Sequence, residues 1–375
     1  MLNRRTLRIK IMQTLFSFDQ CKEADYTLAL DFINERFSPD LNSMEVQDKE
    51  LLRTQKKEAT QYFEKLYIGQ ASSMEVDKKV SDVAEEALRN YQSQVKKDQD
   101  FLAKNSLLEI EKLSNLYFSV LSLLMEFAAL AAAEKKANHS NFVNHPWIAA
   151  ISKNEELKKL LLRSDSGWQN NSSQVRSWFR DIIKEDQTYL GFIALNQTDE
   201  DSQKELIRHV VRKLMLGTGP INEFFEEQDL RWAEDKVIVR SLADKTLKSY
   251  KDGNIEIQKL SLDWEDDKDF IGKLFKGTIE LDEKYKKLIA KNTKNWDVAR
   301  LPLTDRLIIE MAITEMVHFP NIPVKVTINE YIELTKEYST PKSRQFINGI
   351  LDVISKSMIE TGDIKKSGRG LIDNK

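Results

Sequence analysis

The sequence has 375 residues but only 12 glycines and 7 prolines, less than half of their average combined share of about 12%. This scarcity argues against turn-dense β-sandwiches, barrels and glycine-looped nucleotide folds. Apolar residues make up 41% and charged residues 31%, the mixture that amphipathic helices around a shared core require. We therefore expect an all-α protein, long enough for two or three domains.

The formal net charge of −3 argues against a protein that is coated in nucleic acid, although both ends of the sequence are basic. The only cysteine, Cys21, cannot form an internal disulfide, and we expect a free thiol that faces the core. No apolar leader follows Met1, which favours a cytoplasmic protein.

The first segment predicts a helix with a cluster of arginines at its start. Leu7, Ile11, Leu15 and Phe18 fall on one apolar stripe, while Arg4, Arg5 and Arg8 occupy the first turns. Cations at a helix N-terminus oppose the helix dipole, at about 0.3–1 kcal/mol each. A phosphate ligand would relieve that cost, and a solubilising helix end is the alternative interpretation.

The region between Asp40 and His145 has no proline and one glycine, which predicts two long helices. Its most apolar stretch is Leu107 to Ala133. The uncharged run inside it, Leu113 to Met125, is shorter than the about 18 residues of a membrane span, so we expect a buried helix.

From His145 to about Leu262 we expect helices of about ten to fifteen residues, separated by polar breaks. This region also resembles the one after it. Leu206-Ile207, Phe224-Phe225, Leu230-Arg231-Trp232, Asp235 and Ile238 follow the order and approximate spacing of Phe270-Ile271, Tyr285, Asn295-Trp296, Asp305 and Ile308. An internal duplication and chance similarity between helices both stay open.

Four of the seven prolines lie in the last segment, Leu262 to Thr361, between apolar stripes. They predict helices that begin after Leu301-Pro302, Ile322-Pro323 and Pro341. Short proline-set turns of this kind are typical of a compact antiparallel bundle, and we expect Trp296 and Pro302 to set its first turn.

These turns carry motifs that resemble the C-terminal half of the NusB transcription antitermination family. The motifs are Trp296-Asp297-x-x-Arg300-Leu301-Pro302-Leu303-x-Asp305-Arg306-Leu307-Ile308, Ile322-Pro323-x-Lys325-Val326-x-Ile328-Asn329-Glu330-x-Ile332-Glu333-Leu334-x-Lys336, and Ser343-x-x-Phe346-Ile347-Asn348-Gly349-Ile350-Leu351-Asp352. The opening Asn3-Arg4-Arg5-x-x-Arg8, with Met12-Gln13-x-Leu15-Phe16, is similar to the family's arginine-rich first helix.

The resemblance implies a NusB-like helical bundle that is interrupted by a large helical insertion. Residues 1–20 would supply the first helix and residues 262–361 the C-terminal bundle, with a basic flexible tail at 362–375. The insertion, 21–261, has no role that the sequence reveals, and it divides into 21–145 and 146–261 if it forms two parts.

The resemblance also implies a function without enzymatic chemistry. Members of the family bind boxA RNA of ribosomal-operon leaders together with the ribosomal protein NusE, and join NusA and NusG at RNA polymerase to suppress termination. Arg4, Arg5 and Arg8 would contact this RNA, because guanidinium groups pair with phosphates and stack on bases.

The start of the last helix would continue the RNA path. A core phenylalanine and a helix-start asparagine are the plain interpretations of Phe346 and Asn348. The resemblance implies instead that Phe346 is an aromatic platform for a base and that Asn348 contacts the edge of a base. Lys342 and Arg344, in the same turn, would add phosphate contacts.

Motifs for other chemistry are missing from the sequence. The four histidines are too scattered to form a metal site with Cys21, and no cofactor is expected. No phosphate-binding glycine loop or nucleophile signature occurs, and Glu333 with Lys336 predicts a surface ion pair rather than acid–base catalysis. Two alternatives remain: the NusB-like domain of an rRNA methyltransferase-like system, and a scaffold that has lost RNA binding.

Overall fold

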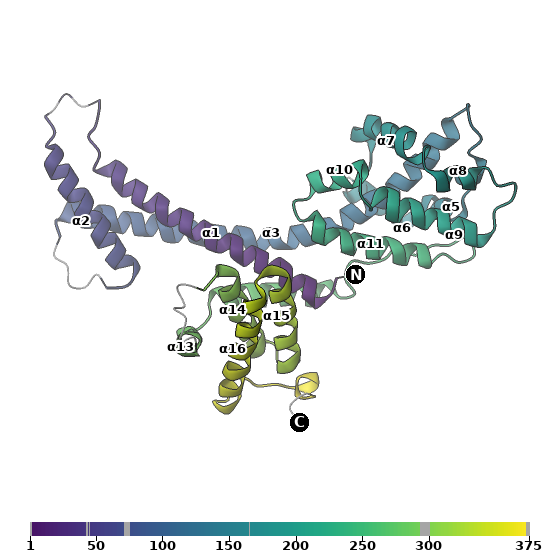
Figure 1. Cartoon of the computed structure of the whole chain (residues 1–375). Coiled ribbons are helices and arrows are strands. Elements are labelled where there is room, and N and C mark those ends of the chain that lie inside the picture. Colours follow the sequence, from purple (N-terminus) through teal and green to yellow (C-terminus); the bar gives the residue numbers. More distant parts are fainter. Residues whose placement is uncertain are drawn as a thin grey trace. The chain divides into compact units, whose positions relative to one another are not determined.

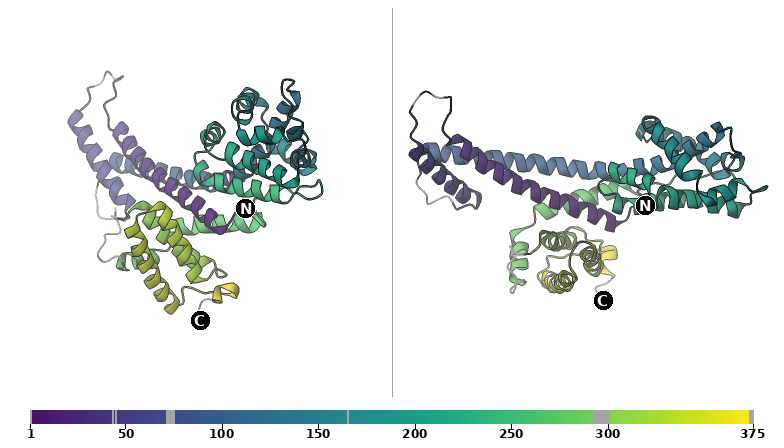
Figure 2. Two further views of the ribbon diagram at one scale, coloured as in Figure 1. Left: turned by 45° about the vertical axis from the view of Figure 1, so that its right-hand side comes forward. Right: turned by 45° about the horizontal axis from the view of Figure 1, so that its top comes forward.

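The structure is a computed structural model that describes residues 2–42, 44, 46–70, 76–164, 166–292 and 301–372 (Figures 1 and 2). Within these ranges the chain forms helices and no strand, which confirms the all-α fold class. The chain divides into two compact units. Unit 1 contains the residues up to Arg4 and Leu108–Asp267, and unit 2 contains Arg5–Leu107 and the residues from Lys268 onward.

Unit 2 combines the N-terminal helices with the C-terminal bundle. Its helices are most of α1 (Arg4–Arg36), α2 (Lys49–Tyr67), the first part of α3 (Lys78–Ala133), most of α12 (Trp264–Ile279), α13 (Glu283–Asn292), α14 (Leu303–His318), α15 (Val324–Tyr338), α16 (Pro341–Glu360) and η6 (Gly368–Leu371). Pro302 and Pro323 are the N-cap residues of α14 and α15, and Pro341 opens α16. The three predicted proline-set helices are therefore confirmed.

Helix α14 is the most enclosed helix of the C-terminal bundle. Its neighbours α15 and α16 pack against it and against each other (Figure 1). Its buried side chains occupy most of its circumference: Asp305, Leu307, Ile308, Ile309, Met311, Ala312, Ile313, Thr314, Glu315 and Met316. Helix α12 approaches closely at Gly277, where a Cβ atom would lie 2.8 Å from Thr314 Cγ2.

A second core of unit 2 lies where the C-terminal half of α1 packs with α2 and the start of α3 (Figure 1). Ile33 of α1, Phe63 of α2 and Ala84 of α3 are fully buried there. Helices α2 and α3 are the two long helices that were predicted between residues 40 and 145.

Unit 1 gathers short helices around the C-terminal half of α3. These are α4 (Ser140–Val143), α5 (Pro146–Lys153), α6 (Glu155–Ser164), η2 (Gln169–Asn171), α7 (Ser172–Trp178), η3 (Phe179–Ile183), α8 (Gln187–Ile193), α9 (Glu200–His209), η4 (Val210–Met215), α10 (Pro220–Gln228) and α11 (Trp232–Lys248). Helices α4, α5, α8 and α10 are shorter than the predicted ten to fifteen residues, whereas α7 and α9 are continued by the π-helical turns η3 and η4.

Among the described helices, α3 is the one that is long and apolar enough to cross a membrane by length and composition alone. Within the fold, 61% of its most apolar window is buried. Val120, Leu121 and Leu124 have no exposed surface and belong to the core of unit 1. This part of α3 is a buried core helix, as predicted.

The described part of the C-terminal tail lies against the turn between α14 and α15 instead of extending away from it. Lys366 Nζ donates to the carbonyl of Phe319 at 3.0 Å, and the Ser367 N–H donates to that of Pro320 at 3.0 Å. A Cβ atom on Gly370 would lie 2.0 Å from the same Pro320 oxygen, so this position has no space for a side chain.

The units divide the chain at other places than the predicted boundary near residue 145. One division falls between Leu107 and Leu108, inside α3, and another between Asp267 and Lys268, inside α12. Much of the predicted insertion, up to residue 107, therefore belongs to the same unit as the C-terminal bundle. Trp296 lies outside the described residues.

Candidate nucleic-acid interface

Arg8 is buried between α1, α14 and α15. Its side chain is 3% exposed, and its Nε and Nη2 donate to Glu315 Oε2 and Oε1 at 2.7 and 2.8 Å. Nη1 reaches Glu330 Oε2 at 3.3 Å. The guanidinium also lies 5.7 Å from the ring centres of Phe270 and Tyr331.

The partner, Glu315, is fully buried and accepts further hydrogen bonds. Thr327 Oγ1 donates to it at 2.8 Å and the Tyr331 hydroxyl at 3.3 Å. Burial holds the pKa of Tyr331 well above its ordinary value, so the hydroxyl remains a donor. Arg8 and Glu315 thus form a satisfied bidentate pair that connects α1 to α14 and α15.

Arg5 lies nearer the surface and is also paired. Its Nε and Nη2 donate to the Glu330 carboxylate at 3.0 and 2.9 Å, and its side chain is 40% exposed. The hydrogen bond that Arg5 donates to Glu330 is the main cause that raises the pKa of Arg5, with smaller contributions from the charges of Glu330, Glu333 and Glu337. Arg5 therefore faces an acidic side of α15.

Arg5 and Arg344 both act on Glu333, on the same side of α15. The pKa of Glu333 is lowered first by its hydrogen bond with Lys336 and then by the charges of Arg5 and Arg344. The predicted ion pair between Glu333 and Lys336 is present. Arg5 of α1 and Arg344 of α16 thus act on one carboxylate although they are far apart in the sequence.

The other predicted contacts of α16 lie in its first turns. Lys342, Arg344 and Asn348 are exposed, and Phe346 is half-buried. Thr340 caps this helix by accepting a hydrogen bond from the Ser343 N–H at 3.1 Å. The cap fixes the start of the helix and so the direction in which these side chains extend.

Arg4 belongs to unit 1, where its guanidinium pairs with Asp266 and lies 3.7 Å from Asp267. Each arginine of the predicted cluster therefore has a carboxylate partner within the chain. These carboxylates offset the unfavourable dipole interaction for which the sequence suggested a phosphate.

Sequence reasoning missed these partners. Glu315 carried a signal, because it follows Ala312 on the apolar stripe of a buried helix, where a lone carboxylate requires a cation. Glu330 and Asp266 carried none, since each lies near other acidic residues on a helix that also carries basic residues.

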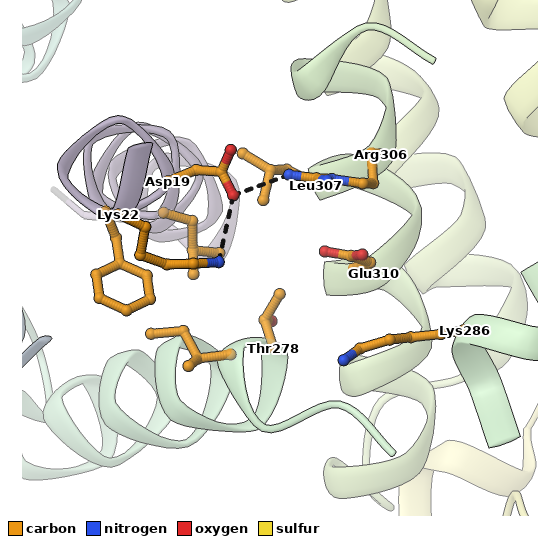
Figure 3. A pocket seen from close by; sticks show the side chains of 10 residues that line it. Asp19, Lys22, Thr278, Lys286, Arg306, Leu307 and Glu310 are labelled. Carbon is orange, nitrogen blue, oxygen red and sulfur yellow. Dashed lines mark hydrogen bonds and ion pairs between the residues drawn. The ribbon is translucent and has the colours of Figure 1, made fainter. Parts of the chain in front are cut away.

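A cavity of about 220 Å³ lies in unit 2 between α1, α12, α13 and α14 (Figure 3). Arg306 Nη2 is 2.9 Å and Lys22 Nζ 3.7 Å from Asp19 Oδ1. Glu310 points into the cavity, and burial raises its pKa despite the nearby cations Arg306, Lys286 and Lys22. The cavity is lined by charged side chains, and the ion pair between Asp19 and Arg306 connects α1 to α14.

The histidines and the cysteine of the described residues show other roles than metal binding. His145 is buried and its Nε2 lies 2.9 Å from the Gln203 carbonyl, while His209 pairs with Asp186 at 3.0 Å. Cys21 is a free, half-buried thiol whose pKa is raised by burial and by the nearby Asp98 and Asp25. Across the described ranges, no three His, Cys, Asp or Glu side chains are grouped as metal ligands.

Comparison with known proteins finds relatives for the C-terminal part of the chain. Residues 229–356 match the model of the NusB family. The transcription antitermination protein NusB of Salinibacter ruber is 40% identical over 105 residues, which cover 28% of this chain and 66% of that protein. The NusB of Chloroherpeton thalassium is 42% identical over 106 residues, covering 28% and 50%. That of Thermodesulfovibrio yellowstonii is 43% identical over 94 residues, covering 25% and 62%.

The chain thus spans between half and about two thirds of the length of the curated relatives it matches. No solved structure matches the chain. The family match begins at Asp229, earlier than the predicted boundary at residue 262, and so includes α11. The C-terminal part of this chain, residues 229–356, is a domain of the NusB family.

Proposed function

We propose that the chain is a transcription antitermination factor that binds boxA-type RNA together with NusE. The observation that carries the proposal is the family match over residues 229–356, with relatives that are 40–43% identical and are named transcription antitermination proteins. The complex would include NusA and NusG at RNA polymerase, and would act in the cytoplasm.

The mechanism is assembly through simultaneous contacts. RNA and NusE would each bind part of the surface of the factor, so that either one raises the affinity for the other. No covalent step is required, and no enzymatic activity is proposed.

The proposed RNA surface runs from Arg5 to the start of α16. Arg5, Lys342 and Arg344 would contact phosphates, while Phe346 and Asn348 would contact bases. Arg4, which belongs to unit 1, would contact a phosphate by exchanging Asp266 for it. Arg8 is buried on Glu315, so its proposed role is to hold α1 in place beside this surface rather than to touch the RNA.

Fluorescence anisotropy of a labelled boxA-like RNA, with and without NusE, tests the proposal. We expect tighter binding to boxA than to a scrambled RNA, and a further gain with NusE. Replacing Lys342 and Arg344 by alanine should weaken binding at least tenfold and flatten its salt dependence by about two charges. Arg163→Ala, which removes an exposed arginine of unit 1, is the matched control.

Equal affinity for boxA and scrambled RNA, unaffected by NusE, would overturn the proposal. That result would favour a scaffold that has lost RNA binding. The pairing of Arg4, Arg5 and Arg8 with carboxylates supports this alternative.

A further inference from the structure

We propose that unit 1 contains a binding pocket for a nucleobase. The pocket has a volume of about 350 Å³ and lies between α3, α10 and the loop that joins α6 to α7. Every described residue that lines it precedes residue 229, where the NusB family match begins. It therefore offers a role for a part of the chain that the family does not explain.

The volume is sufficient for a heterocycle with its sugar. Ligand pockets in proteins have volumes of about 300–1,000 Å³, so this pocket falls at the small end of that range. The cavity between α1 and α14 is smaller, and its charged lining disfavours a neutral ring. The pocket of unit 1 is the better candidate for an organic ligand.

One side of the pocket is aromatic. The ring centre of Trp168 lies 5.5 Å from that of Phe224 and 6.0 Å from that of Phe225. Trp168 and Phe225 are buried, whereas Phe224 is half-buried and presents part of its ring. An aromatic ring at the edge of a pocket is the surface on which an unstacked base packs.

Trp168 and Ser166, which lie on this side of the pocket, are hydrogen-bonded to α3. Trp168 Nε1 donates to the Ser119 carbonyl at 3.0 Å, and the Ser122 hydroxyl donates to the Ser166 carbonyl at 2.9 Å. These bonds place the aromatic side in advance of any ligand, so binding would not require the loop to become ordered.

The remaining surface supplies amides. Asn115 of α3 and Asn171 line the pocket, and the side chains of both make no hydrogen bond to another described residue. An amide offers a donor and an acceptor side by side, the arrangement that pairs with the edge of a base such as adenine. Two available amides beside an aromatic ring match both the face and the edge of a base.

Other ligand classes fit less well. The described lining includes no carboxylate, which disfavours a metal ion, and only one cation, Lys112. Lys112 already donates to the Gln228 carbonyl at 2.9 Å, so it can assist with a single phosphate but does not form an anion site. The amides and hydroxyls make the pocket too polar for a purely apolar ligand.

The base could come from a free nucleotide or from single-stranded RNA, and two experiments on the full chain distinguish these sources. In saturation-transfer NMR with AMP, we expect transfer mainly to the adenine protons. Asn115→Leu and Asn171→Leu should each reduce AMP affinity at least tenfold. Asn196→Leu, at an exposed asparagine outside the pocket, should leave it unchanged. Unchanged circular dichroism melting would show that the variants fold.

The second experiment uses photo-crosslinking of an RNA with 4-thiouridine placed within and beyond a boxA-like element. RNA as the source predicts crosslinks to peptides from residues 164–171 or 220–228, and their loss in Asn115→Leu. If crosslinks form only at other peptides while AMP still binds, the pocket is assigned to free nucleotides.

Saturation transfer to the ribose protons of AMP alone would overturn the inference. AMP binding that neither leucine variant weakens would also overturn it. Absence of both AMP transfer and the pocket crosslinks would do the same. The proposed antitermination function is tested separately, because it would survive this result if boxA affinity still rises with NusE. The antitermination function would be rejected, and the pocket retained, if AMP binds in the pocket but the chain does not distinguish boxA from scrambled RNA.

Discussion

Arg8 lies in the first turns of α1, yet its charge is matched inside the bundle by Glu315 of α14. A buried pair of this kind stabilises the fold little when compared with apolar residues of similar volume. Removing one partner is costly, because the other charge stays buried without compensation. The pair therefore fixes how α1 docks on the bundle.

We expect Arg8→Met to destabilise unit 2 by about 3–5 kcal/mol, since it leaves the Glu315 carboxylate buried and unpaired. Urea denaturation followed by circular dichroism measures this loss. Arg5→Met is the matched control on the same helix, where the more exposed pair with Glu330 contributes about 1 kcal/mol or less. Similar losses in both variants would contradict a buried role for Arg8.

His145 makes the stability of unit 1 depend on pH. Burial lowers its pKa to about 4, while its hydrogen bond with the Gln203 carbonyl acts in the opposite direction. The unfolded chain binds a proton near pH 6.5, whereas the folded chain does so only near pH 4. Stability from this group is therefore complete above pH 6.5 and is lost as the pH falls toward 4.

At pH 5 the loss from His145 should reach about 2 kcal/mol, given a folded pKa of about 4 and an ordinary value of 6.5. The comparison is between the wild type and His145→Gln, in urea unfolding at pH 7.5, 6 and 5. The variant should be less sensitive to acid. Parallel pH profiles for the two proteins would contradict the prediction.

At the scale of single residues, the sequence identified the arginine cluster but not its partners. An interaction between residues that are close in the sequence can be predicted from the sequence, as the ion pair between Glu333 and Lys336 shows. Arg8 and Glu315 are separated by 307 positions, so only the fold reveals that they meet.

At the scale of helices, prolines made the C-terminal elements predictable. Proline fixes its own φ and lacks an N–H, so it marks a helix start that tertiary packing rarely shifts. Unit 1 has few such marks, and π-helical turns such as Phe179–Ile183 have no recognisable sequence signal. Several of its helices have fewer than the predicted ten residues, because few residues in the sequence mark where they end.

The possible duplication stays a prediction. Helices α9 and η4, α10 and α11 follow one another as α12, α13 and α14 do, and the matched apolar residues lie on corresponding helices. Asn295 and Trp296, which carry part of the similarity, lie outside the described residues.

Two glycines of α12 provide a test of helix packing. Gly277→Ala should destabilise unit 2 by about 1–3 kcal/mol, because the new methyl group would meet Thr314 of α14. Gly272→Ala has open space and should be neutral or stabilise the helix by about 0.5–1 kcal/mol. Thermal melting of both variants measures the difference. Equal melting temperatures would show that α12 and α14 are not in close contact.

At the scale of the whole molecule, the sequence predicted an insertion between two pieces of one bundle, and the contacts of α1 with α14 and α15 bring those pieces together. Helix α3 continues from Lys78 to Ala133 without a glycine or proline, so no helix break marks where one core ends and the next begins. The division after Leu107 coincides instead with the start of the most apolar stretch of the helix, a change in composition that the sequence shows but that does not by itself predict a new unit.

We expect the C-terminal bundle to need α1 for folding. A fragment of residues 268–372 would expose the surface that buries Leu7, Ile11 and Leu15 and would leave Glu315 unpaired. It should melt without a cooperative transition. Adding a peptide of residues 2–24 should restore one, and a peptide with Arg8→Met should bind at least tenfold more weakly. A cooperative melt of the fragment alone would contradict this expectation.

The enclosure of α14 also limits how this domain can evolve. Because buried side chains occupy most of its circumference, this helix offers little surface to a partner. Most substitutions in it are constrained by packing, whatever the domain binds. Selection for a new partner acts mainly on the surrounding helices, so differences in specificity between such domains are to be sought there.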